Sequence, residues 1–307
     1  MAIESIPNSF EMIESDQEIP AEYYNQMVDR NLGVLTPEQQ DAVSKMIVAI
    51  AGVGGNADVA ITLAQMGFQH FRVADPDVYG MSNLNRQLGC TSETLGKNKA
   101  VIIAEEIKRI NPLATVEIYP DGVTVDNVEE FLQDADVVVD GIDIYAMDAK
   151  KKYFDVAREN GQAVFCCPAI GYGAAIGIFD PVKSPTFDEY FGIPPANEDP
   201  GDLEFRRYVE NFGMMFLSTK PAGMDMTYAR KRSKLGKAPA IAAGCRLNSA
   251  LVASAVMDYK FGLSKNIPIV PTTWHIDLVK GKIIKTGKIK RWLLKKVIAM
   301  TQMKGDV

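Results

Sequence analysis

Apolar residues recur along the chain in two patterns, which together predict buried strands connected by helices. Residues 46–51 form a continuous apolar run, as expected of a strand buried on both faces of a parallel sheet. Residues 59–66 then place apolar side chains at helical spacing, and Gly67 is positioned to end that helix. A strand at 71–74 comes next. The order strand, glycine turn, helix, strand is typical of a parallel α/β unit.

Later segments repeat these patterns and extend the predicted sheet. A further strand is expected at 135–143, followed by a helix at 145–160. Two strands joined by a glycine turn are expected within 163–179, an apolar helix at 240–261 and a last strand at 273–278. These elements predict a Rossmann-like, doubly wound, mostly parallel α/β sheet with an antiparallel extension toward its C-terminal end.

The first strand ends in a glycine-rich turn of the kind that binds phosphate. Gly52 permits a tight turn, while Gly54 and Gly55 let the backbone approach a phosphate at the positive end of the following helix. Asp75 ends the next strand, at about the 20-residue spacing where an acidic residue holds a ribose. These features predict a nucleotide site, but they do not separate ATP from NAD, FAD or S-adenosylmethionine.

The residues from Asp75 onward separate these alternatives, because they contain further motifs in a fixed order. The motifs are DPD at 75–77, SNLNRQ at 82–87, GKNK at 96–99, INP at 110–112 and DGID at 140–143. With the glycine turn, they make the chain resemble the ThiF/HesA/MoeB family, the ubiquitin-activating-enzyme-like adenylyltransferases, over about residues 28–180. The resemblance implies ATP and Mg²⁺ as cofactors, and it places the family's binding positions on Gly54, Gly55, Asp75, Asn83, Arg86, Gln87, Lys99 and Asp143. Gly52 and Asp77 complete the predicted nucleotide-binding set.

The chemistry of these residues suits the cleavage of ATP between its α- and β-phosphates. That cleavage requires positive charge on several phosphates at once, which Arg86 and Lys99 can supply. Asp143 can hold Mg²⁺, which usually takes one or two carboxylates together with phosphate oxygens. Asn83 and Gln87 are polar groups able to orient phosphates or an attacking carboxylate.

Members of the family also carry an N-terminal arginine that reaches the nucleotide of the neighbouring subunit. Arg30 is the only arginine or lysine before Lys45 and is therefore the candidate for this role. The resemblance implies that Arg30 stabilises transition-state charge and that the active form is a homodimer. The alternative is an arginine on the surface of a helix.

The resemblance implies an enzyme that adenylates a carboxylate, the C-terminus of a small protein or peptide, and releases pyrophosphate. Two alternatives stay open: an NAD(P)-dependent oxidoreductase that uses the same turn, and a catalytically idle relative that docks a partner. The set Arg86, Lys99 and Asp143 has no role in a dehydrogenase, which favours adenylation. The turn 56–58 departs from the family's glycine–leucine–glycine, and Asp58 could crowd a phosphate.

The four cysteines argue against both a zinc site and a thioester relay. They are Cys90, Cys166, Cys167 and Cys245. None forms a Cys-x-x-Cys pair, and the chain has two histidines, so a structural zinc is not expected. Residues 181–240, which correspond to the family's crossover loop, contain no cysteine. We expect the last three cysteines to be buried and Cys90 to be the most exposed.

The predicted crossover loop is also rich in aromatic residues, which favour burial. They include Phe187, Tyr190, Phe191, Phe205, Tyr208 and Phe212. Their density indicates that the loop packs either on the core or on a substrate peptide.

Composition and charge set the remaining expectations. Apolar residues make up 47% of the chain and charged residues 23%, which is typical of a soluble globular protein, and the net charge of −6 argues against a nucleic-acid partner.

Residues 280–304 hold nine lysines and arginines and no acid. The chain thus divides into an acidic segment (1–27), an adenylation domain (28–279) and a basic amphipathic tail (280–307). We expect the tail to dock on the acidic body rather than on a membrane surface. No apolar segment is long enough for a membrane span, and the N-terminus does not resemble a secretory signal. Four cysteines are too few for a disulfide framework, so a protein of the reducing cytoplasm is expected.

Overall fold

The computed structural model describes residues 19, 22–143, 146–191, 221–233 and 239–287. The strands are β1 (Ile47–Ala51), β2 (His70–Ala74), β3 (Thr115–Tyr119), β4 (Val137–Asp140), β5 (Val164–Cys166), β6 (Ala169–Ile170), β7 (Gly173–Phe179), β8 (Thr273–Asp277) and β9 (Lys282–Thr286). The α-helices are α1 (Tyr23–Met27), α2 (Pro37–Lys45), α3 (Ala57–Gln65), α4 (Lys99–Ile110), α5 (Val128–Leu132), α6 (Met147–Glu159), α7 (Phe187–Phe191), α9 (Met226–Ser233) and α10 (Ala242–Phe261). Short 3₁₀ turns lie at η1 (Asp29–Asn31) and η2 (Met81–Asn83).

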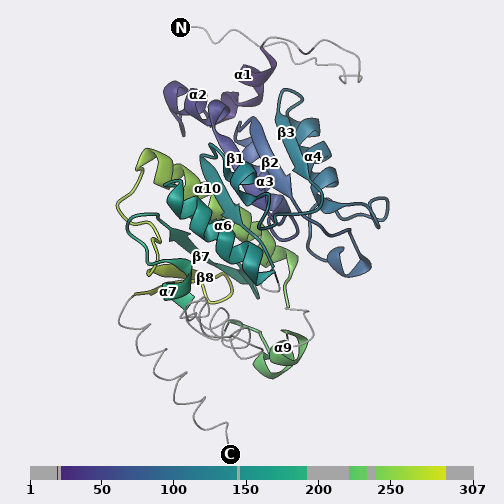
Figure 1. Cartoon of the computed structure of the whole chain (residues 1–307), viewed down its shortest axis with the longest axis vertical. Coiled ribbons are helices and arrows are strands. Elements are labelled where there is room, and N and C mark those ends of the chain that lie inside the picture. Colours follow the sequence, from purple (N-terminus) through teal and green to yellow (C-terminus); the bar gives the residue numbers. More distant parts are fainter. Residues whose placement is uncertain (1–18, 20–21, 144–145, 192–220, 234–238, 288–307) are drawn as a thin grey trace, which may run out of the picture.

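The strands form one sheet in the order β3-β2-β1-β4-β5-β7-β8-β9, with β6 paired to β7 (Figure 1). The first five in this order are parallel. The apolar runs of β1 and β4 predict this, whereas β3, with the sequence TVEIY, was not predicted from the sequence. From β1 the chain winds outward through β2 to β3, and from β4 it winds in the other direction to β5. The winding therefore reverses between β1 and β4, which is where open α/β sheets bind their ligands.

Helices cover both faces of the sheet because successive side chains of a buried strand point to opposite sides. Val48 and Ile50 of β1 belong to a core shared with α3, α4 and α10. Ala49 and Ala51 belong to a second core, shared with α5 and α6. The predicted doubly wound α/β fold is therefore confirmed.

The antiparallel extension is also confirmed. Strands β7, β8 and β9 pair antiparallel beyond β5, and α10 packs along β7. The first residues of the predicted basic tail pair with β8 as strand β9, whereas residues 288–307 lie outside the described part of the chain. No helix that the structure describes combines the length and the apolar character needed to cross a membrane.

The predicted crossover loop begins by packing on the core. Three of its aromatic side chains, those of Phe187, Tyr190 and Phe191 in α7, are buried. The ring of Phe187 lies 4.6 Å from that of Phe154 on α6, and the ring of Tyr190 lies 5.0 Å from that of Phe179 on β7. The other three aromatic residues named above fall outside the described residues. Core packing is thus the observed arrangement for the described part of this loop.

Candidate active site

The carboxyl ends of β1 and β4 meet where the winding of the sheet reverses. The Gly141 N–H donates to the Ala51 carbonyl at 2.6 Å, and the Gly52 N–H donates to the Ala74 carbonyl at 2.7 Å. Gly52 has a φ of +82°, and a Cβ at this position would overlap the carbonyl group of Gly141. Only glycine fits such a close approach with positive φ, so the first glycine of the turn acts as predicted.

The same close approach makes Gly141 sensitive to substitution. A Cβ on Gly141 would lie 2.6 Å from the Gly52 carbonyl oxygen and 2.8 Å from that of Ala51. We expect Gly141→Ala to lower the free energy of unfolding by about 1–3 kcal/mol, the usual cost of overpacking. Gly55→Ala is the matched control, because a Cβ there meets no atom within 4 Å. Denaturant unfolding compares the two variants, and equal midpoints would refute the steric argument.

Three predicted residues come together around the turn. A Cβ on Gly54 would lie 3.1 Å from the Gln87 side-chain nitrogen and 3.6 Å from the Lys99 ammonium. The amide oxygen of Gln87 is buried and has no hydrogen-bond partner among the described residues. A buried amide oxygen without a partner is costly. The turn therefore presents backbone, an amide and an ammonium group to the same small volume.

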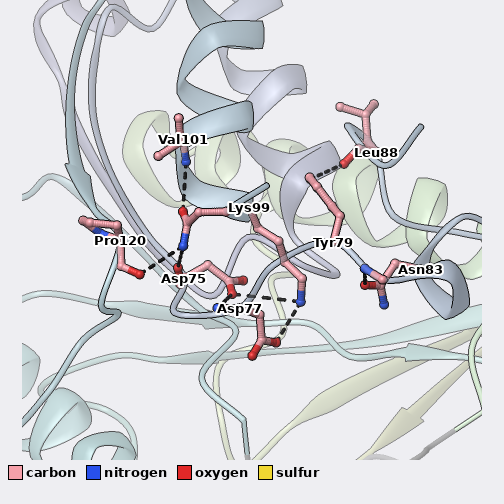
Figure 2. A network of polar contacts seen from close by, with 10 residues as sticks. Asp75, Asp77, Tyr79, Asn83, Leu88, Lys99, Val101 and Pro120 are labelled. Atoms are coloured by element: carbon pink, nitrogen blue, oxygen red, sulfur yellow. Dashed lines mark hydrogen bonds and ion pairs between the residues drawn. The ribbon is translucent and has the colours of Figure 1, made fainter. Parts of the chain in front are cut away.

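Lys99 is placed there by the start of helix α4. The Asn98 side chain caps the helix by accepting from the Val101 N–H at 3.2 Å, and it donates to the Asp75 carbonyl at 3.0 Å. The Lys99 ammonium then lies 2.8 Å from the carboxylate of Asp77 and 4.0 Å from that of Asp75 (Figure 2). The capping asparagine thus ties the helix start to the end of β2, which fixes the lysine beside both predicted aspartates.

Asp75 and Asp77 differ in their exposure to solvent. The Asp75 side chain is buried and accepts from the Asp77 N–H at 3.0 Å, whereas the Asp77 carboxylate is 69% exposed. Burial raises the pKa of Asp75, and the nearby Lys99 charge opposes that shift. Asp75 is therefore a fixed acceptor at the end of β2, while Asp77 is a solvated counter-ion for Lys99.

The loop that carries Asn83 and Arg86 is fixed by its own hydrogen bonds. The Tyr79 hydroxyl donates to the Leu88 carbonyl at 2.7 Å, and the Asn83 side-chain oxygen accepts from the Gly80 N–H at 2.9 Å (Figure 2). The Arg86 guanidinium donates to the Ser82 carbonyl at 2.8 Å, within the same loop. The structure therefore shows a local role for Asn83 and Arg86, and their contact with a nucleotide stays a prediction.

Asp143 lies on the turn that follows β4, three residues after Asp140. Its backbone carbonyl accepts from the Ala146 N–H at 3.0 Å, which closes the turn before α6. Its side chain is exposed at the carboxyl edge of the sheet. Among the residues that the structure describes, no group of three or more His, Cys, Asp or Glu side chains is arranged to hold a metal ion. A cation at Asp143 would need further oxygens from a ligand, such as phosphate.

Arg30 lies far from the glycine turn of its own chain. It is exposed in η1, beside α1. The Tyr24 hydroxyl of α1 donates to the Gly67 carbonyl at 2.8 Å, just beyond the end of α3, and the Tyr23 hydroxyl donates to the Ile110 carbonyl at the end of α4. These helix ends lie at the amino edge of the sheet (Figure 1). Arg30 could therefore reach a nucleotide only in a second subunit, and that role stays a prediction.

The atypical turn at 56–58 is held by helix α10 rather than pointing into open space. The Asn56 side chain donates to the Asp140 carbonyl at 3.2 Å and accepts from Asn248 at 3.0 Å. The buried Asp58 carboxylate forms an ion pair with Arg246. The two polar residues of this turn, Asn56 and Asp58, thus each have a bonding partner within the fold.

A buried ion pair beside the site was not predicted from the sequence. Lys150 of α6 binds Asp140, the last residue of β4, and both side chains are no more than 2% exposed. One signal was available: Lys150 precedes Tyr153, Phe154 and Ala157 on the buried face of α6, at helical spacing. A lysine in an apolar stripe indicates a buried partner.

The cysteines lie as predicted, with three buried and Cys90 partly exposed. Burial raises the pKa of all four thiols. The neutral thiol is a poor nucleophile. If the chain catalyses the adenylation that its sequence predicts, we expect Cys90→Ser to keep the rate of that reaction within about twofold. The check is the initial rate of the variant beside wild type, and a loss of about tenfold or more would show that the thiol takes part.

Comparison with known proteins identifies a family and several relatives with similar sequences. The model of the ThiF family matches residues 28–291. Sulfur carrier protein adenylyltransferase from Thermus thermophilus is 34% identical over 122 residues, 39% of this chain and 44% of the relative. The tRNA threonylcarbamoyladenosine dehydratase of Escherichia coli is 30% identical over 185 residues, 60% of this chain and 64% of the relative. The chain thus spans less than two thirds of the length of these relatives.

Two solved structures share the fold. A crystal structure of E. coli MccB with ATP superposes with a TM-score of 0.62 at 19% identity, over 88% of this chain and 73% of the other. The structure of PaaA superposes with a TM-score of 0.61 at 18% identity, over 91% and 85%. Identities this low establish the fold alone.

Proposed function

Since the chain belongs to the ThiF family, we propose that it is an ATP-dependent adenylyltransferase that activates a carboxylate. The carboxylate oxygen bonds to the α-phosphorus of ATP, the bond to the bridging oxygen breaks, and pyrophosphate leaves with the electron pair. The products are an acyl-adenylate and pyrophosphate. A carboxylate is already ionised near pH 7, so the reaction needs no general base.

One observation carries this proposal: Gly54, Gln87 and Lys99 surround the same small volume at the reversal of the sheet. We expect phosphate groups to bind here, because the Lys99 ammonium supplies positive charge, Gly54 lets a ligand approach the backbone and α3 begins at the turn. The Gln87 amide, with one oxygen lacking a partner in the described residues, is able to turn its nitrogen toward a phosphate. Asp75 is the acceptor for a ribose hydroxyl.

The side chains act mainly by placing charge. Lys99 holds Asp77 as its solvated counter-ion, and the phosphates of ATP would replace that carboxylate. Arg86 would leave its loop carbonyl for a phosphate, where its planar fork binds two oxygens at once. Such groups stabilise the charge that develops on the leaving pyrophosphate. Positioning of the carboxylate supplies the remaining acceleration.

Asp143 would hold Mg²⁺ together with phosphate oxygens, since Mg²⁺ usually takes one or two carboxylates and completes its shell with other oxygens. When bound, Mg²⁺ neutralises charge on the phosphates. In a homodimer, Arg30 would reach the nucleotide of the partner subunit, in agreement with its distance from its own site.

The proposed substrate is the C-terminus of a small protein or peptide. This is supported by a relative named for a sulfur carrier protein and by MccB structures that contain MccA.

Product analysis tests this function. The purified chain is incubated with α-labelled ATP, MgCl₂ and a panel of small proteins and peptides, including C-termini ending in Gly-Gly or an amide-bearing residue. We expect pyrophosphate and a labelled acyl-adenylate, from which hydrolysis releases labelled AMP, and both depend on one member of the panel. Formation of ADP and phosphate, or tight binding of NADH in place of ATP, would contradict the proposal.

A further inference from the structure

The buried pair Asp140–Lys150 is a feature of the site that the proposed reaction does not use directly. The Lys150 ammonium lies 2.7 and 2.6 Å from the two carboxylate oxygens of Asp140. The same ammonium donates to the carbonyl of Ile142 at 2.9 Å. Lys150 therefore binds both the last residue of β4 and the turn that follows it.

This arrangement fixes the peptide group next to Asp143. On one side, the Ile142 N–H donates to the Asp140 carboxylate at 3.2 Å. On the other side, the Ile142 carbonyl, which is bonded to the Asp143 nitrogen, accepts from Lys150. Both polar groups of Ile142 are thus held by one buried ion pair. The Asp140–Lys150 pair therefore fixes the direction in which the chain leaves β4 toward Asp143.

Stability alone does not account for this pair. Burying two charges costs desolvation energy, and apolar residues of similar volume often serve a core equally well or better. An apolar pair, however, would leave the Ile142 carbonyl without its donor. The hydrogen bond from Lys150 to the Ile142 carbonyl is therefore a contribution that an apolar pair cannot make.

We infer that Lys150 is a positioning residue, which acts through Asp140 and Ile142 to hold the Asp143 carboxylate where Mg²⁺ and the phosphates of ATP meet. The inference rests on the proposed function, since it assigns Asp143 to that ion. Groups that orient a metal ligand usually change metal affinity by about 10–100-fold when they are removed.

Calorimetric titration of ATP, once with MgCl₂ and once with EDTA, tests the inference without relying on turnover. Wild type is expected to bind ATP more tightly with Mg²⁺. In Lys150→Met this Mg²⁺-dependent gain in affinity is expected to fall by about tenfold or to vanish, while affinity in EDTA is kept. The matched control is Lys152→Met, because Lys152 lies on the same helix, is 39% exposed and pairs with Glu129.

A double variant covers the case in which Lys150→Met fails to fold. Asp140→Leu with Lys150→Met leaves no unpaired buried charge, so we expect a stable protein. It should still lose the Mg²⁺-dependent gain, because Ile142 has lost its anchor. If the double variant or Lys150→Met keeps the full gain, or if wild type binds ATP without any gain, the inference is wrong. If wild type binds no ATP under either condition, the proposed function fails and the inference falls with it.

Discussion

Replacing Lys99 with methionine is expected to lower the adenylation rate by about 100-fold or more, the usual loss when one preorganised charged donor is removed. The lysine is 6% exposed, begins helix α4 and lies beside both Gly54 and Asp77. Methionine keeps most of the packing volume, so the fold should persist.

The matched control is Lys97→Met, two residues earlier on the exposed approach to the same helix. It removes one positive charge from the same motif without touching the turn. Initial rates and thermal unfolding of both variants should be measured together. A rate for Lys99→Met within about threefold of wild type would show that this ammonium does not stabilise the leaving phosphates.

Replacing Asp143 with asparagine is expected to lower the rate by a similar factor, about 100-fold, through a different step. The substitution keeps the size of the side chain but removes the negative charge that would hold Mg²⁺. Asp143 is exposed, so thermal unfolding of the variant is measured beside wild type to separate a loss of rate from a loss of stability. We expect ATP to bind as before in EDTA and to lose its response to Mg²⁺.

Asp148→Asn is the control for this second prediction, since Asp148 is also exposed and lies in the first turn of α6. Calorimetry with and without Mg²⁺, followed by initial rates, separates binding from chemistry. An Asp143→Asn protein that keeps both its Mg²⁺ response and its rate would show that the Asp143 carboxylate does not bind Mg²⁺ in the reaction.

The sequence predicts the centre of the fold because strand, turn and helix there are each defined by neighbouring residues. The apolar run before Gly52 and the helical spacing after the glycine turn act over short distances, so both elements could be predicted. The carboxyl ends of parallel strands share one edge, which explains why motifs far apart in the sequence meet.

Other features depend on contacts between distant residues, which no local pattern contains. Asn248 binds Asn56 across 192 positions, and the pattern of α10 indicates only an apolar helix with small residues. The packing of the ring of Phe187 on that of Phe154 likewise follows from the path of the chain. The direction of a long side chain such as Arg86 depends on the bound ligand as well as on the fold, so its role requires experiment.

The central claim is that this edge of the sheet joins a carboxylate to the α-phosphate of ATP. Exchange of labelled pyrophosphate into ATP measures that step directly, because it requires the reaction to be reversible on the protein and does not require the fate of the adenylate to be known. We expect exchange that depends on Mg²⁺ and on the C-terminus of one peptide or small protein of the panel. This exchange should be lost in Lys99→Met and kept in Lys97→Met. Intact ATP binding with no exchange across a broad panel of carboxylates would contradict it.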